Sequence, residues 1–158
     1  MGYLRTTRCI ELSTIDYLET QINANWSGVT TVKAFTQVYS DTINVPVVCV
    51  RLIQTMSNRR EIGATTLNNN YLIQIDIFAK SDGQRLDLAD FITDKLKDGW
   101  TYYTYSQQSG NKEVLDETAS GYIIVTSFND NSKIEMGDNV ELKDKFRHSI
   151  SISVRKSE

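Results

Sequence analysis

Apolar and polar residues alternate most clearly in two segments of this chain. Residues 71–80 (YLIQIDIFAK) carry an apolar side chain at every odd position, and residues 146–154 (FRHSISISV) separate Phe, His, Ile and Val from Arg and Ser. A period of two predicts β-strands with one face toward a core. Residues 29–39, 45–55 and 122–128 are rich in β-branched and aromatic side chains and predict three further strands. The pattern therefore indicates a mostly antiparallel sheet.

Helical spacing predicts a first helix before these strands. Ser13 has the side chain of an N-cap, and Gly28 gives the helix its end. The apolar residues between them are Ile15, Leu18, Ile22 and Trp26. They fall on one narrow stripe, which suits packing on the flat face of a sheet.

A second helix follows the strand at 71–80. Ser81 or Asp82 caps its start, the helix runs to about Lys97, and Gly99 stops it. Its apolar face consists of Leu88, Ala89, Ile92 and Leu96. Two helices and a sheet with one apolar face indicate a single α+β domain over residues 1–158, with both helices packed on one face.

Three polar segments interrupt this framework. Neither the period of two of a strand nor the helical period is visible in residues 56–70, 106–120 and 129–144. We therefore expect these segments to be long loops around a small regular core. They hold much of the chain's surplus of Ser, Thr and Asn. Long loops often carry function, and the polarity of these segments favours contact with other proteins.

Composition excludes several classes of protein. The chain has 158 residues with 40% hydrophobic and 23% charged side chains, enough for one core without disulfides or a metal. A net charge of −3 has the wrong sign for a protein that coats nucleic acid. The longest apolar run, residues 45–50, is too short to cross a bilayer, and residues 1–10 lack the apolar core of a signal peptide. No membrane association is expected.

Catalytic chemistry is not indicated by any motif. The only histidine, His148, lies on the inward face of the last predicted strand, so a core or interface position is expected. Cys9 and Cys49 do not form the CxxC pair of a zinc or redox site, and Cys49 falls in an apolar strand where a buried thiol is expected. There is no glycine-rich phosphate loop. We therefore predict no catalytic residue, no cofactor and no metal.

A row of aspartates on the second helix is the most distinctive charged feature. Asp87, Asp90, Asp94 and Asp98 share the face opposite the apolar one, and Phe91 lies beside them. This face is either solvated, or meets Arg or Lys of another subunit, or binds a divalent cation. Carboxylates on one helix face point the same way, whereas cation sites usually surround the ion with a loop. The metal is therefore the least favoured of the three.

Two other groups of side chains are candidates for an interface. Arg59 and Arg60 lie in the first polar segment, where they are either solvated or contact phosphate or an acidic group of another subunit. Trp100, Tyr102 and Tyr103 form an aromatic patch after the second helix. Such a patch can stack on bases, but few Lys and Arg surround it. Covering a sheet edge or packing at a subunit interface, where Tyr and Trp are enriched, is favoured.

The segment from the central strand into the second helix has a recognisable sequence. Residues 71–92 read YLIQIDIFAKSDGQRLDLADFI, and this strand, turn and helix resemble the tail terminator proteins of tailed bacteriophages, also called tail completion or neck proteins. The amphipathic first helix, the VPVV strand, the aromatic stretch at 99–105 and the last strand extend the similarity. It covers most of the chain in architecture and about twenty residues in motif.

The resemblance implies a structural role in the virion. Members of this family form rings, typically hexamers, that cap the finished tail tube, meet the head-side connector and let DNA pass through the lumen. They have no catalytic residues. The chain is accordingly expected to bind copies of itself, the tail tube protein and the head-side connector, at the tail–head junction of a particle assembled in the host cytoplasm. The alternatives are a connector or stopper ring on the head side and, less favoured, a small ligand-binding domain.

Overall fold

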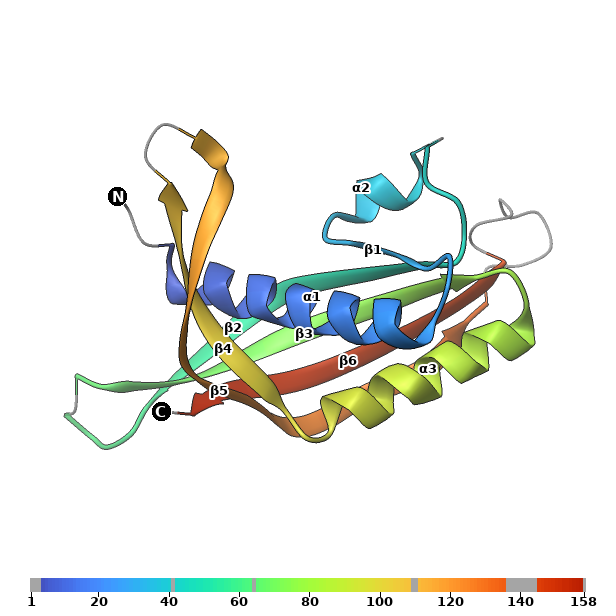
Figure 1. Cartoon of the computed structure of the whole chain (residues 1–158). Helices are drawn as coiled ribbons and strands as arrows, with labels where there is room; N and C mark the ends of the chain where they lie inside the picture. Colours follow the sequence, from blue (N-terminus) through green and yellow to red (C-terminus); the bar gives the residue numbers. More distant parts are fainter. Residues whose placement is uncertain (1–3, 41, 64, 109–110, 136–144, 158) are drawn as a thin grey trace.

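A curled six-stranded sheet carries two long helices on one face (Figure 1). The computed structural model describes residues 4–40, 42–63, 65–108, 111–135 and 145–157. In chain order the elements are α1 (Thr6–Asn25), β1 (Thr30–Val32), α2 (Phe35–Val38), β2 (Val47–Arg59), β3 (Leu67–Ala79), α3 (Asp82–Leu96), β4 (Trp100–Gln108), β5 (Asn111–Ile134) and β6 (Phe146–Ser157). The predicted α+β class is confirmed, and α2 adds one short helix to the two expected.

The strands form two hairpins that a later strand joins. Their order across the sheet is β1-β2-β3-β6-β5-β4. β1 runs parallel to β2, and every other pair is antiparallel. β2 and β3 form one hairpin and β4 and β5 the other, while β6 pairs with β3 on one side and β5 on the other. The sheet is therefore continuous only through β6.

The main core lies between this sheet and the helices α1 and α3. Alternate residues of the central strands face the helices because successive side chains of a strand point to opposite faces. The buried strand residues are Val48, Val50, Ile73, Ile75, Ile77, Ile150, Ile152 and Val154. The buried helix residues include Ile10, Leu18, Ile22, Leu88, Ile92 and Leu96. The predicted inward positions of both alternating strands and of the second helix are confirmed.

A smaller core covers part of the opposite face. The segment from β1 to α2 folds over the start of β2 and the end of β3, and it buries Val32, Val38, Val47, Cys49 and Phe78. The expected burial of the Cys49 thiol is confirmed, and Cys9 is also buried; both are free cysteines. Burial raises the pKa of Cys49 to about 11, so this thiol stays protonated and unreactive.

The first helix spans the opening between two edges of the curled sheet. The Glu11 carboxylate accepts a hydrogen bond from the Leu52 backbone N–H of β2 at 2.9 Å. The Ser13 hydroxyl accepts from the Tyr103 backbone N–H of β4 at 3.0 Å and donates to the Tyr103 carbonyl at 3.3 Å. Helix α1 therefore satisfies edge groups that would otherwise be open to another strand.

The start of α1 differs from the prediction. The helix begins at Thr6, and Ser13 is buried within it rather than capping it. The buried stripe continues toward the N-terminus through Cys9 and Ile10, so the helix gains packed surface by extending past Ser13. The hydroxyl that suggested an N-cap bonds instead to the edge of β4.

The strand predicted at 29–39 is wrong beyond Val32. β1 has three residues, and α2 is a single helical turn. The Gln37 side-chain carbonyl accepts hydrogen bonds from the backbone N–H groups of Lys33 and Ala34 at 3.3 and 3.1 Å. These two hydrogen bonds stabilise the helical turn of α2 relative to the extended strand that the sequence predicted. The turn also buries the Val38 side chain in the smaller core.

Two of the three predicted loops are paired strands. Residues 56–59 and 67–70 continue the β2–β3 ladder, and much of 106–120 belongs to the β4–β5 ladder. Both hairpins extend past the ends of the helices as arms (Figure 1). An arm with solvent on both faces needs no apolar alternation, which is why its sequence resembles a loop. Of the third segment, 129–134 belongs to β5, and 136–144 lies outside the described residues.

Candidate functional site

Most of the predicted aromatic patch belongs to the core of the chain itself. Trp100 and Tyr102 are each 2% exposed. The Trp100 indole N–H donates to the Thr14 hydroxyl at 3.2 Å, and its ring stacks on that of Tyr17 with 5.5 Å between centroids. The Tyr17 hydroxyl donates to the Lys95 carbonyl of α3 at 2.7 Å. Trp100 and Tyr102 thus cover the sheet edge under α1, the first of the two favoured interpretations, and their burial corrects the alternative that they lie in a partner interface.

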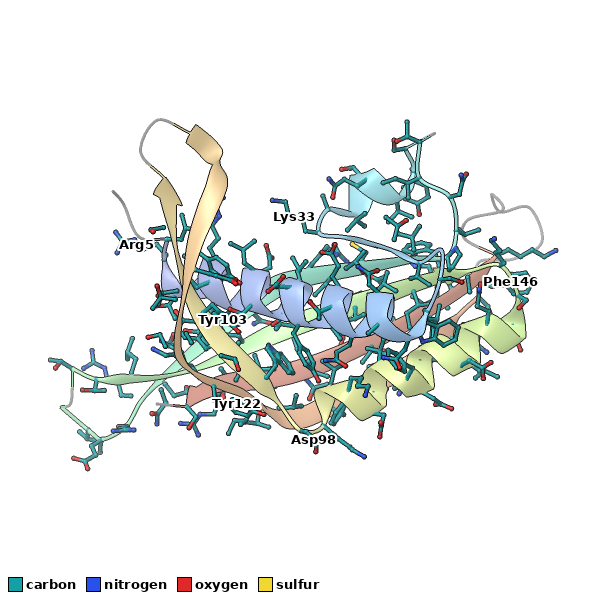
Figure 2. The ribbon with its side chains drawn as sticks, viewed as in Figure 1. Arg5, Lys33, Asp98, Tyr103, Tyr122 and Phe146 are labelled. Atoms are coloured by element: carbon teal, nitrogen blue, oxygen red, sulfur yellow. The ribbon has the colours of Figure 1, made fainter. Side chains whose placement is uncertain are left out.

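Tyr103 remains accessible on the same strand. Its backbone bonds to Ser13, while its half-buried ring lies 6.4 Å from that of Tyr105 (Figure 2). Burial raises the pKa of Tyr102 and of Tyr105 to about 12, so both buried phenols stay neutral. Of the three predicted aromatic residues, Tyr103 alone offers ring surface to a partner.

The acidic face of α3 lies in solvent, as its spacing predicts. Asp87, Asp90, Asp94 and Asp98 are all exposed. Asp94 forms an ion pair with Lys97 at 2.7 Å, and the hydrogen bond from this ammonium group lowers the pKa of the Asp94 carboxyl. Pairs between exposed groups are weak, so the whole row remains open to a partner.

Phe91 is in part used by its own chain. Its ring meets that of Trp26 edge to face at 6.0 Å, and the Lys95 ammonium group lies 5.6 Å from the Phe91 centroid. The Phe91 ring therefore packs in part between the end of α1 and α3. The rest borders the acidic face, where the sequence places it.

Arg59 and Arg60 lie at the end of β2, on the β2–β3 arm. Both are exposed, and the Arg60 guanidinium donates to the Asn68 side-chain oxygen at 3.1 Å across the hairpin. Apolar side chains are also exposed on this arm, namely Met56, Ile62 and Leu67. An arm that carries both cations and solvent-exposed apolar groups is suited to contact another protein.

A cleft of about 510 Å³ lies beside the base of this arm. Its walls come from the start of α1, from the hairpin and from the end of β6. The pairing of Tyr71 with Val154 brings Arg155 and Lys156 to the cleft that Arg60 also lines. We call this feature the basic cleft; its lining residues are Thr6, Arg60, Thr66, Leu67, Asn68, Asn69, Tyr71, Arg155, Lys156 and Ser157. Sequence reasoning missed it, although two adjacent cations after an apolar strand were a usable signal.

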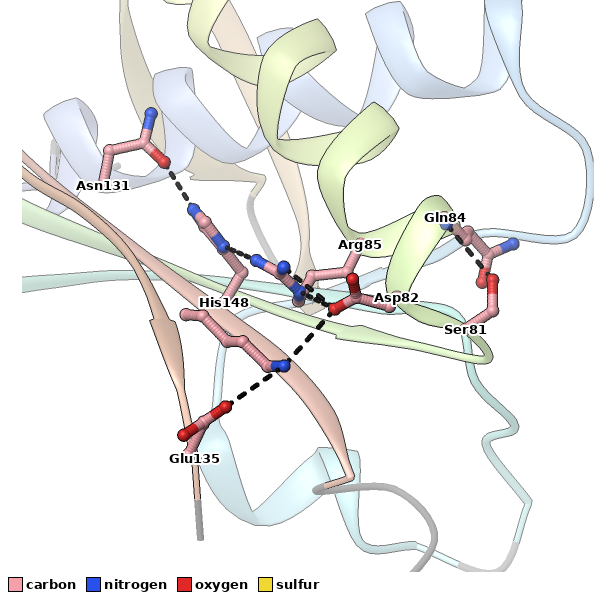
Figure 3. A network of polar contacts seen from close by, with 8 residues as sticks. Ser81, Asp82, Gln84, Arg85, Asn131, Glu135 and His148 are labelled. Carbon is pink, nitrogen blue, oxygen red and sulfur yellow. Dashed lines mark hydrogen bonds and ion pairs between the residues drawn. The ribbon is translucent and has the colours of Figure 1, made fainter.

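The single histidine, His148, connects α3 to strands β5 and β6 by hydrogen bonds. Figure 3 shows His148 of β6 between Arg85 of α3 and Asn131 of β5. The Arg85 guanidinium, which always donates, lies 2.6 Å from His148 Nδ1 and also donates to Asp82 at 2.9 and 3.0 Å. Nδ1 is therefore the acceptor, and Nε2 carries the proton that it donates to Asn131.

This arrangement keeps the imidazole neutral. Burial and the neighbouring Arg85 charge both lower the pKa of His148. The expected interior position of His148 is confirmed, since it is 5% exposed. Every nitrogen of the ring is committed to a structural partner, so His148 is not placed as a base for a bound substrate.

A buried carboxylate lies on the face of the sheet opposite the helices. Asp76 is fully buried on β3, where the Arg51 guanidinium approaches at 3.1 Å and that of Arg147 at 3.5 Å. The Gln74 amide adds a hydrogen bond at 3.3 Å. The two cations compensate the buried charge, so this group ties β2, β3 and β6 together. Sequence reasoning did not single it out.

The described residues offer neither a metal site nor a helix that could span a membrane. Among the described residues, no group of three or more His, Cys, Asp or Glu side chains could hold a metal ion. Within the same residues, no helix is long and apolar enough to span a membrane.

Comparison with models of known protein families gives no match to this chain, and comparison with curated proteins gives none either.

Proposed function

We propose that this chain is a non-enzymatic structural protein of a tailed bacteriophage. It forms a ring, a hexamer by the family resemblance, that terminates the tail tube and joins it to the head-side connector, with DNA passing through the lumen. The location is the tail–head junction of the virion. The proposal starts from the sequence of residues 71–92, which resembles tail terminator proteins, and that segment forms β3, the Ser81-capped turn and α3.

The observation that carries the proposal is the pair of hairpin arms on a compact sheet. The β2–β3 arm, which precedes Tyr71 in the chain, lies outside the packed core and exposes apolar Ile62 and Leu67 among polar residues. Exposed apolar side chains on an extended arm gain free energy when a neighbouring subunit covers them. A ring is a natural product of such contacts, because an arm that binds a different surface of the next copy repeats around an axis.

The charge of the chain supports passage of DNA without retention. A net charge of −3 gives no overall attraction for the phosphate backbone. A lumen lined by subunits of this kind lets DNA slide through, whereas a strongly basic ring would hold it.

Imaging and light scattering of the purified protein test the proposal. We expect rings with a central hole in negative stain and a mass of several subunits by light scattering, either alone or after addition of the tail tube protein of the same phage. Rings on the ends of tube assemblies support a tail terminator, while binding to the head-side connector alone supports the head-side alternative. A strict monomer with and without the tube protein contradicts the proposal.

A further inference from the structure

The basic cleft holds three cations that lack an anionic partner. Arg60, Arg155 and Lys156 line it, and no carboxylate side chain does so within the described part of the chain. The Arg60 Nε group is bonded to the Asn68 amide oxygen at 3.1 Å, and the Lys156 ammonium group lies 4.6 Å from the centroid of the Tyr102 ring. None of the three forms an ion pair with a described carboxylate. The cleft is therefore complementary to negative charge.

The N-terminal half of α3 offers the matching charges. Asp87 and Asp90 are exposed, and neither forms an ion pair within the described residues. Other carboxylates of this helix are engaged: Asp82 bonds to Arg85, and Asp94 to Lys97. Leu86 beside them is 46% exposed. This face therefore presents two free carboxylates with an apolar neighbour.

The two surfaces cannot meet within one chain. The cleft lies at the Tyr71 end of β3, and α3 begins beyond the other end of that strand, at Ala79. Eight residues of strand correspond to about 26 Å at about 3.3 Å per residue. Helix α3 runs back along the sheet, so Asp87 and Asp90 lie about 8–12 Å closer than its start at about 1.5 Å per residue, which leaves about 14 Å or more between the two surfaces. Figure 1 shows the start of α3 and the β2–β3 arm at opposite ends of the sheet. An Asp87–Asp90 face that reaches this cleft therefore belongs to another molecule.

We propose that the basic cleft of one copy binds the Asp87–Asp90 face of α3 of a second copy. The contact joins two different surfaces, so each copy has one of each left for the next neighbour, and the association runs head to tail. The inference rests on the proposed function in that a closed ring needs such a contact, and it names the residues that make it. The exposed Leu86 side chain adds apolar contact to the ion pairs.

The contact has a recognisable dependence on salt. Ion pairs between exposed groups contribute little one at a time, so the association depends on several cations acting on two carboxylates at once. Raising the salt concentration from about 50 mM to about 500 mM shortens the screening length severalfold and weakens such a contact. Charge reversal of Arg155 is expected to weaken self-association about tenfold or more.

Disulfide trapping tests the contact directly. Asp90→Cys and Arg155→Cys are made as separate proteins and mixed under mild oxidation, since native Cys9 and Cys49 are buried. We expect a covalent dimer in which peptides containing the two new cysteines are linked. The matched control replaces Asp90→Cys by Glu19→Cys, an exposed carboxylate on α1, and gives no such product.

Each outcome separates the contact from the proposed function. Rings without the crosslink overturn this contact and leave the tail terminator intact, whereas the crosslink without rings supports the contact and contradicts the ring. Sedimentation of Arg155→Glu beside Lys33→Glu, an exposed cation elsewhere, gives a second readout; equal association of both overturns the inference. So does loss of short-duplex DNA binding in Arg155→Glu with self-association unchanged, because the cleft would then be a phosphate site.

Discussion

Arg85 and His148 illustrate how a cation is buried in this chain. The guanidinium is 5% exposed and spends its donors on Asp82 and on the neutral imidazole. Since a protonated imidazole could not accept from Arg85, the bond exists only in the neutral state of His148. The same three side chains connect the start of α3 to the end of the sheet, so the protonation of one ring is linked to the stability of the whole domain.

Stability is therefore expected to fall in mild acid. The pKa of His148 is lowered in the folded state, and unfolding returns it to about 6.5. As pH falls below about 6.5, His148 binds a proton in the unfolded chain but stays neutral in the folded chain. The free energy of unfolding therefore decreases by up to about 1.4 kcal/mol per pH unit until the pH reaches the pKa of His148 in the folded state. Urea denaturation at several values between pH 7 and pH 5 measures this slope.

The control for this prediction is His148→Gln. Its amide can accept from Arg85 and donate to Asn131 without titrating, so the variant is expected to show a shallower slope over the same pH window. Carboxylates with lowered pKa, such as Asp82 and Asp94, act at lower pH and affect both proteins equally. Identical slopes for the wild type and the variant would refute a role for the imidazole.

The turn from α3 into β4 brings its glycine very close to a neighbouring strand. Gly99 has φ of +76°, and its backbone N–H donates to the Leu96 carbonyl at 3.2 Å. A Cβ atom at this position would lie 2.5 Å from the Ile123 carbonyl oxygen. Glycine is therefore required twice, once for the backbone conformation and once for the close approach of β5. The sequence predicts the stop at Gly99 but not the second constraint.

Gly99→Ala is expected to destabilise the domain strongly. A left-handed backbone costs a non-glycine residue about 1–3 kcal/mol, and the clash with backbone adds to this. Gly63→Ala is the matched control, because Gly63 also has positive φ, at +86°, but its added Cβ atom meets nothing within 4 Å. We expect a loss of about 1 kcal/mol for Gly63→Ala and at least about 3 kcal/mol for Gly99→Ala. Equal losses in urea denaturation would show that the close approach is unimportant.

Some elements of this fold are predictable from the sequence and others are not. The strands at 71–80 and 146–154 are predictable because one face is covered by α1 and α3, which imposes alternation. The arms are not, because solvent on both faces removes that constraint. The position of Ser13 misleads since a buried hydroxyl bonded to a β4 edge and an N-cap look identical in sequence.

On the scale of the whole molecule, the compact sheet and its arms have separate roles. The main core is formed by residues of α1, α3 and the central strands, and the β2–β3 arm at 56–70 contributes no buried apolar side chain among the described residues. The arm is therefore dispensable for folding in a way that the core is not. The proposed ring, by contrast, depends on surfaces outside the core.

Shortening the arm separates these two roles. Replacing residues 58–68 by the two-residue turn Asn-Gly leaves Ser57 opposite Asn69 and so keeps the register of the rest of β2 and β3. We expect the thermal midpoint to stay within a few degrees of the wild type, while the mass by light scattering falls toward that of a monomer. A ring of normal appearance from the shortened chain would show that the arm is not used in assembly.

The candidate surfaces were predictable only where one element carries them. The acidic face of α3 follows from helical spacing alone. The basic cleft does not, because its cations lie almost one hundred positions apart and meet through the pairing of β3 with β6. For Trp100 and Tyr102 the sequence left a covered sheet edge and a subunit interface both open, since their burial depends on α1 crossing the edge of β4.

The position of β6 has a consequence for biosynthesis. This strand lies in the middle of the sheet, yet every other strand precedes it in the chain. A chain still on the ribosome therefore holds two separate hairpins whose inner edges, on β3 and β5, have no partner. At a synthesis rate of about 5–20 residues per second, the edge of β3 stays unpaired for several seconds before β6 is made. During that time it is the part of the nascent protein most exposed to chaperones and to pairing with other chains.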